Sequence, residues 1–122
     1  MKKILVAVMV VCTLFMIPIL ADAAARPGFD DKEIRIAQWG PQTGPAAPWG
    51  SVARGSGLLF NVVNEQGGIH GRMIKYFIRD DQYNPAQTKA VVKELVEREG
   101  IFAFVGGVGG ACGLAVMDYL SE

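Results

Sequence analysis

From residue 34 onward, the hydrophobic pattern alternates between the two-residue spacing of strands and the three- to four-residue spacing of helices. The strand-like runs are short and rich in β-branched and aromatic residues. The last of them, IFAFV, is apolar throughout, which is typical of a strand covered on both faces. The predicted elements are strands over residues 34–39, 72–79 and 101–105, and helices over residues 49–66, 85–99 and 111–120.

The first predicted helix has an apolar spacing that defines one buried face. That face comprises Val52, Ser56, Leu59, Val62 and Val63. Gly55 and Gly57 lower the helix propensity, and we expect that they allow close packing against the sheet. The pair Gly67 and Gly68 ends the helix, because glycine takes the left-handed cap conformation without strain.

The second predicted helix begins with a strong start signal. Asn84 can cap it, Pro85 suits the first helical position, and Gln87 can reach back to the cap. Gly100 stops the helix. The expected buried positions are Val91, Val92, Leu95 and Val96, and the expected four-apart ion pairs are Lys93 with Glu97 and Glu94 with Arg98.

Strands that alternate with helices predict an α/β fold with three layers and a parallel sheet. Right-handed crossovers place the first strand in the centre, which gives the order 2-1-3. The carboxyl ends of the first and third strands then frame a topological switch point, where ligands bind in open α/β sheets. The loops over residues 40–49 and 106–111 are therefore the expected ligand site.

The glycine-rich turn at residues 106–110 opens the third helix. It offers the backbone N–H groups of Gly110, Ala111 and Cys112 to a carboxylate or another polar group. Gly109 beside them is also a predicted ligand-binding residue, because glycine lets a ligand approach the backbone closely. The alternative is a tight turn that needs glycine for its geometry alone. Trp49 ends the other loop and could cap the apolar part of a ligand, or it could pack at the helix start.

An enzyme remains an alternative interpretation. The turn misses a dinucleotide-binding fingerprint by one position, no lysine follows it as a phosphate-binding loop requires, and Cys112 could act as a nucleophile. Asp80 and Asp81 are interpreted as loop and cap residues, Trp39 as a core residue and His70 as a turn residue. With a single histidine, no metal cluster is expected, and no cofactor is predicted.

The amino terminus predicts export. Lys2 and Lys3 precede an apolar run over residues 4–20, and Ala21-Asp22-Ala23 follows as a small-residue cleavage site. This order is that of a cleaved signal peptide over residues 1–23, rather than of a membrane anchor. Residues 24–33 are expected to form a flexible lead-in. The chain is neutral overall, so a nucleic-acid partner is not expected.

Four segments in series resemble the branched-chain amino-acid-binding (leucine-binding) family of periplasmic substrate-binding proteins. These segments are IRIAQWGPQTGPAAPWG, NEQGGIHGR, RDDQYNP and FVGGVGG. The resemblance implies the first part of lobe one of a type I periplasmic-binding-protein fold, a small-molecule ligand held between two lobes, and delivery to the membrane permease of an ABC transporter. It also implies that ligand contacts Trp49 and the turn at Gly110, Ala111 and Cys112.

Two features depart from this family pattern. The turn reads GGAC, without the serine or threonine hydroxyls that many amino-acid binders place there, so another small organic solute is as compatible as an amino acid. Tyr83 and Gly109 occupy positions where some members carry a disulfide. Residues 34–122 are expected to be an incomplete amino-terminal lobe, and residues 24–122 alone are expected to be marginally folded and to bind ligand weakly or not at all. A sensor or receptor lobe shares this fold and stays an alternative.

Overall fold

The computed structural model describes residues 28–121, and its centre is a parallel sheet of three strands. The strands are β1 (Glu33–Gly40), β2 (Met73–Asp80) and β3 (Ala103–Phe104), in the spatial order β2-β1-β3. β1 and β2 pair along their full length, whereas β1 and β3 pair at two positions. The α/β class and the predicted order 2-1-3 are confirmed.

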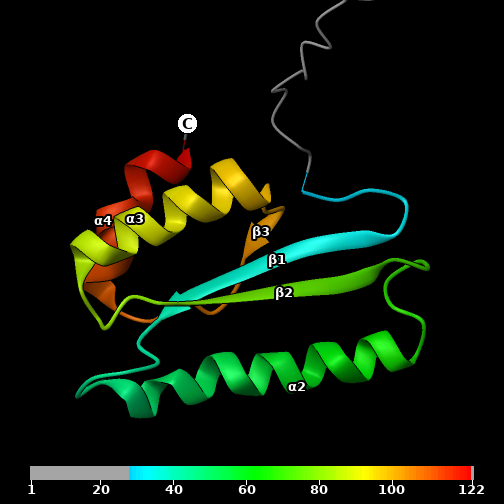
Figure 1. The fold of residues 1–122 in the computed structure, drawn as a ribbon, viewed down its shortest axis with the longest axis horizontal. Helices are drawn as coiled ribbons and strands as arrows, with labels where there is room; N and C mark the ends of the chain where they lie inside the picture. The colour runs from blue at the N-terminus through cyan, green and yellow to red at the C-terminus, as the bar shows by residue number, and fades with distance from the viewer. Residues whose placement is uncertain (1–27, 122) are drawn as a thin grey trace, which may run out of the picture.

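The helices form the two outer layers. Helix α2 (Ser51–Glu65) lies on one face of the sheet, and α3 (Pro85–Glu94) and α4 (Gly110–Ser121) pack together on the other (Figure 1). This arrangement follows from two right-handed crossovers, because the one from β1 to β2 and the one from β2 to β3 run across the sheet in opposite directions. The buried apolar side chains between the layers include Ala37, Ala53, Ile74, Val92, Leu95 and Val116. No helix of residues 28–121 is long and apolar enough to span a bilayer.

Helix α2 starts later and turns a different face to the sheet than the sequence predicts. A short 3-10 turn, η1 (Ala47–Gly50), precedes it. Within the expected buried face, Val52, Leu59 and Val62 are 41%, 62% and 48% exposed, so that part of the prediction is wrong. Ser56 and Val63 are half-buried as predicted, and the other buried or half-buried residues of the helix are Ala53, Gly57, Phe60 and Asn64.

The helix face that the sheet covers packs against Tyr76 of β2. A Cβ at Gly57 would lie 3.6 Å from the ring of Tyr76, which is an ordinary van der Waals contact. Phe60 then meets the same tyrosine edge to face, with ring centroids 4.9 Å apart. Gly57 thus lies against the sheet as expected, although an added Cβ would fit there without a clash. Gly55 has no atom within 4 Å of its Cβ position and makes no such contact.

Helix α3 begins at its predicted cap. The Asn84 side chain accepts hydrogen bonds from the Ala86 and Gln87 N–H groups at 2.9 and 3.3 Å. The expected return bond is absent, because the Gln87 side chain donates to Gln82 instead. After Glu94 the helix widens into a π-helical turn, η2 (Leu95–Glu99), and Gly100 ends it in the left-handed conformation, as predicted.

Only one of the two predicted helix ion pairs forms. Lys93 and Glu97 lie 3.7 Å apart, as the four-residue spacing predicts. Glu94 is paired with Arg79 of β2 at 3.1 Å, not with Arg98. A local spacing rule could not anticipate this pair, because the partner comes from a strand beneath the helix.

The third strand is shorter than the predicted residues 101–105. Phe29 forms an antiparallel bridge with Ile34, and the Gly28 carbonyl accepts the Arg35 N–H at 2.8 Å. These residues occupy the part of the β1 edge that a longer β3 would pair with. They belong to the predicted lead-in, whereas the predicted signal peptide lies outside the described residues.

Candidate functional site

An open hollow of about 560 Å³ lies at the carboxyl ends of the strands, where the loops after β1, β2 and β3 meet. Its position is the one that the switch-point argument predicts. It brings together three of the predicted site residues, Trp49, Gly109 and Gly110. The residues that line it are Pro45, Ala46, Trp49, Tyr83, Val108, Gly109 and Gly110.

Trp49 projects from the short turn η1 and is 63% exposed. Its backbone is fixed, because its N–H donates to the Ala46 carbonyl at 3.0 Å and the next turn begins helix α2. So large an exposed fraction does not fit a side chain that packs at the helix start. The indole ring is therefore a free wall of the hollow.

The glycine turn forms the floor of the hollow, and part of it is required by geometry alone. A Cβ on Gly107 would overlap the ring of Trp39 at the end of β1. Trp39 also packs against Phe104, with ring centroids 5.1 Å apart, and is half-buried, as expected of a core residue. Its buried Nε1 has no partner among the described residues. Close packing under the turn thus accounts for Gly107.

A buried polar side chain also fixes the floor. Gln38 of β1 is fully buried and donates from Nε2 to the Gly106 carbonyl. Its Oε1 accepts the hydroxyl of Tyr76 in β2. Burial raises the pKa of Tyr76, so this hydroxyl remains a donor at neutral pH. One amide therefore links β1, β2 and the turn after β3.

The amino terminus of α4 opens into this hollow. The first helical bond runs from the Gly113 N–H to the Gly109 carbonyl at 2.8 Å. The N–H groups of Gly110, Ala111 and Cys112 therefore have no acceptor within the helix. No atom lies within 4 Å of the Cβ position of Gly110, which leaves room for a ligand to approach.

Cys112 and Ala111 contribute no side chain to the lining. The Cys112 thiol is fully buried and packs beside Gly109. Because a nucleophile must be accessible, this burial removes the structural support for the cysteine-enzyme interpretation. His70 lies in the turn before β2, as predicted, and thus at the opposite end of the sheet from Cys112.

Tyr83 is a lining residue that sequence reasoning missed as a ligand contact. It lies in the loop between β2 and α3 and is 45% exposed. One feature of the sequence could have indicated it: Tyr83 follows the carboxyl end of β2, and β2 neighbours β1 at the switch point. Asp81 beside it is fully buried and accepts the Tyr83 N–H at 2.9 Å and the Thr88 hydroxyl at 2.8 Å.

Asp80 joins this loop to the one after β1. Its carboxylate accepts the Gln42 and Gln82 N–H groups at 2.8 and 3.0 Å, and the Thr43 hydroxyl. Burial alone would raise the pKa of Asp80, but these hydrogen bonds outweigh it and lower the pKa. The two aspartates are thus loop-fixing residues, as expected. No cluster of three potential metal ligands occurs among residues 28–121.

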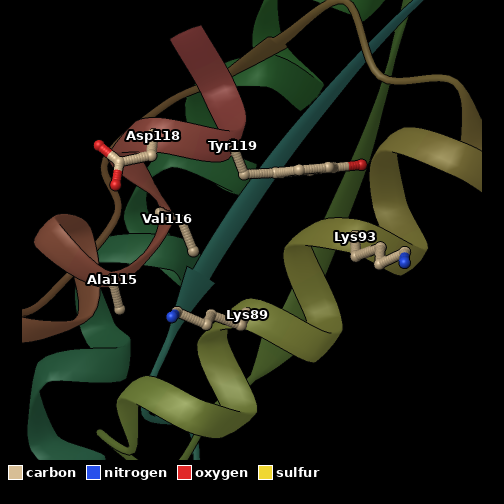
Figure 2. Close-up of a pocket in the computed structure, with 6 residues that line it drawn as sticks. All are labelled: Lys89, Lys93, Ala115, Val116, Asp118 and Tyr119. Carbon is tan, nitrogen blue, oxygen red and sulfur yellow. The ribbon is translucent and has the colours of Figure 1, made fainter. Parts of the chain in front are cut away.

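A second hollow of about 270 Å³ lies between α3 and α4, away from the loops (Figure 2). Lys89 and Lys93 border it from α3, while the ring of Tyr119 reaches across from α4. The Asp118 carboxylate points away from α3 in this view. None of the predicted site residues lines it, so the hollow at the strand ends is the candidate site.

A three-layer α/β sheet with a ligand-sized hollow at its switch point defines a class of small-molecule-binding folds. The model of the periplasmic binding protein family matches residues 33–122. The chain therefore belongs to the periplasmic binding protein family, which confirms the resemblance seen in the sequence motifs.

Individual relatives support the same assignment. The chain is 37% identical over 76 residues to the leucine-, isoleucine-, valine-, threonine- and alanine-binding protein of Pseudomonas aeruginosa. That match covers 62% of this chain and 20% of the relative, so the chain spans about a fifth of the relative's length.

Solved structures show the same fold. A fatty acid ABC transporter substrate-binding protein from Thermomonospora curvata has a TM-score of 0.70 at 29% identity, over 77% of this chain and 24% of that one. The branched-chain amino acid transporter substrate-binding protein of Streptococcus pneumoniae, solved with isoleucine, has a TM-score of 0.69 at 25% identity, over 74% and 26%. The described residues thus have the fold of the first part of a type I periplasmic-binding-protein lobe.

Proposed function

We propose that this chain forms the first part of an extracytoplasmic solute-binding protein that serves an ABC uptake system. The observation that supports this most directly is the hollow at the strand ends, with its exposed tryptophan and its open helix terminus. Its lining is mostly apolar, as small-molecule sites are. The partner is the membrane permease of the transporter, the place is the periplasm after signal-peptide cleavage, and no catalysis takes place.

The proposed ligand is an amino acid or a similar small organic solute, held between this lobe and a second one. A carboxylate or another polar group would accept hydrogen bonds from the N–H groups of Gly110, Ala111 and Cys112. The apolar part would lie against Trp49, and Gly109 would let the ligand approach the backbone. The buried Cys112 would contribute its backbone only.

We further propose that residues 34–122 are part of a larger lobe. No described segment pairs with the outer side of β3, and large apolar side chains next to β3 and on α4 are exposed. Covering them would bury apolar surface at about 25 cal/mol per Å². The exposed residues are Phe102, Val105, Leu114, Met117 and Leu120.

Binding by the mature protein from its native host tests the proposed function. Isothermal titration with a panel of amino acids and small carboxylates should identify a ligand. Trp49→Ala should then weaken its affinity about tenfold, which corresponds to about 1.4 kcal/mol. Leu58→Ala is the matched control, because Leu58 is 69% exposed on α2 and lies outside the hollow. Equal loss in both variants would contradict the assignment of Trp49.

The intact mass of the protein in a periplasmic extract tests the proposal about the lobe. A species well above 13.1 kDa is expected, since the rest of the lobe and a second lobe would add to this chain. A species slightly below that mass, with the signal removed, would contradict it. Residues 24–122 expressed alone should unfold without a cooperative thermal transition and should bind ligand weakly.

A further inference from the structure

The hollow at the strand ends presents two exposed aromatic rings that come from different loops. Trp49 follows β1 and Tyr83 follows β2, and they are 63% and 45% exposed. The remaining lining residues are glycine, alanine, proline and valine, so none of the lining side chains carries a charge. This wall of the site can recognise ring faces, and it offers no carboxylate to an ammonium group.

The backbone at Tyr83 is held in an unusual conformation. Gln82 and Tyr83 have φ angles of 51° and 62°, in the left-handed region that residues other than glycine rarely adopt. Such strain persists only where the surroundings impose it, and it concentrates at functional sites. Here the buried Asp81 imposes it, because its carboxylate accepts the Tyr83 N–H and its backbone carbonyl accepts the Asn84 N–H at 2.8 Å.

The same carboxylate is itself anchored in the interior. The Thr88 hydroxyl of helix α3 donates to it at 2.8 Å, and both residues are fully buried. The backbone from which the tyrosine ring projects is therefore held from the interior.

Gly109 makes room for the ring. A Cβ at that position would lie 3.1 Å from Cε2 of Tyr83, which is tighter than an ordinary van der Waals contact. The ring thus rests with one edge on the floor of the hollow, while nearly half of its surface stays free. The tyrosine is placed as a second wall beside the turn.

We propose that Tyr83 is a specificity-determining residue that, together with Trp49, selects a ligand with an aromatic ring. The ligand class is aromatic carboxylates, in preference to aliphatic amino acids. This inference rests on the proposed binding function, and it identifies the chemical class of ligand for the same hollow. Ring faces in contact add attraction beyond the area they bury, and an aliphatic side chain gains none of it.

The test uses the mature protein purified from its native host and two probes, 4-hydroxybenzoate and leucine. Isothermal titration should show tighter binding of 4-hydroxybenzoate. Tyr83→Leu keeps an apolar side chain but removes the ring, and it should weaken binding of 4-hydroxybenzoate about three- to tenfold. Tyr83→Phe keeps the ring at the same strained position, and it should bind like the original protein.

Tyr119→Leu is the matched control. Tyr119 is 37% exposed and lines the other hollow, between α3 and α4 (Figure 2). Removal of this ring should leave binding of both probes unchanged. An equal loss of affinity in both leucine variants would mean that lost stability, and not lost ring contact, explains the effect, and would overturn the role of Tyr83.

The remaining outcomes separate this inference from the proposed function. If leucine binds more tightly than 4-hydroxybenzoate, the binding function stands and the ligand class is wrong. If Tyr83→Leu leaves the affinity for 4-hydroxybenzoate unchanged, the binding function stands and Tyr83 is not the specificity-determining residue. If neither probe binds and the wider panel of solutes also fails, the proposed function is wrong, and the inference falls with it.

Discussion

β2 and β3 both flank β1, but their outer edges differ. On the β2 side, Asn64 of helix α2 reaches the strand, donating to the Ile74 carbonyl at 2.8 Å and accepting the Ile74 N–H at 2.7 Å. On the β3 side, no described strand or helix covers the edge, and Phe102 and Val105 are 57% and 39% exposed. A side chain thus satisfies one outward-facing backbone pair on the β2 edge, whereas no described element covers the β3 edge.

This difference indicates which edge of the sheet further strands would extend. An exposed strand edge is a template for pairing with another chain, and proteins usually cover or shorten it. Asn64 satisfies a backbone pair that would otherwise face water at the β2 edge. The short β3 has no such cover, so the sheet is expected to continue from β3 and not from β2.

A substitution in the buried core should lower the free energy of unfolding more than any change at the sheet edges. Leu95 is fully buried in the π-helical turn η2. Leu95→Ala should lower the free energy of unfolding of the mature protein by about 2–5 kcal/mol, because it removes buried methyl groups and leaves a cavity. Urea denaturation measures it. Val96→Ala is the control, since Val96 is 36% exposed and should cost much less. Equal costs would contradict the assigned core.

The hydrogen bonds of Asn64 at the β2 edge should contribute less to the free energy of unfolding than the buried core does. Asn64→Leu removes both hydrogen bonds to Ile74 and should lower the free energy of unfolding by about 1–3 kcal/mol. Asn61→Leu, one turn earlier on an exposed position of the same helix, is the matched control and should change stability little. Hydrogen exchange at the Ile74 amide should speed up in the first variant only. Unchanged exchange in Asn64→Leu would mean that the edge is protected in another way.

The smallest expected effect concerns pH and the junction between the loops after β1 and β2. Since the pKa of Asp80 is lowered in the folded state, its contribution to stability is complete above the usual carboxyl pKa. That contribution is lost as the pH falls through the lowered value. Thr43→Val removes one of the donors, so the pKa of Asp80 should rise toward its usual value. Carbon-detected NMR titration checks this, and an unchanged pKa would contradict it.

The topology was predictable because it depends on patterns that extend over many residues, so a single atypical residue does not change them. Three alternations of strand and helix period and a capped helix start at Asn84 were sufficient for the order of the strands. The buried face of α2 was not predictable in this way, because its inner positions include Ala53 and Gly57, which a count of large apolar residues overlooks. The partner of Glu94 lies on a strand, out of reach of any local spacing rule.

Part of the candidate site was also predictable from the topology. The two loops at the switch point followed from topology alone, and they contain Trp49 and the glycine turn. Tyr83 comes from the third loop, and its place in the hollow depends on a backbone conformation that Asp81 imposes from the interior. No pattern in the sequence displays that conformation, so only the structure reveals the second ring.

The bond from Gln38 to the turn after β3 has a consequence for the thermodynamics of binding. Gln38 fixes the Gly106 carbonyl, and the ring of Trp39 fills the space beneath Gly107. The turn therefore has its final shape before any ligand arrives. The conformational entropy of the turn is lost during folding, so it does not subtract from the affinity for a ligand. A ligand that binds here meets a floor that is already formed.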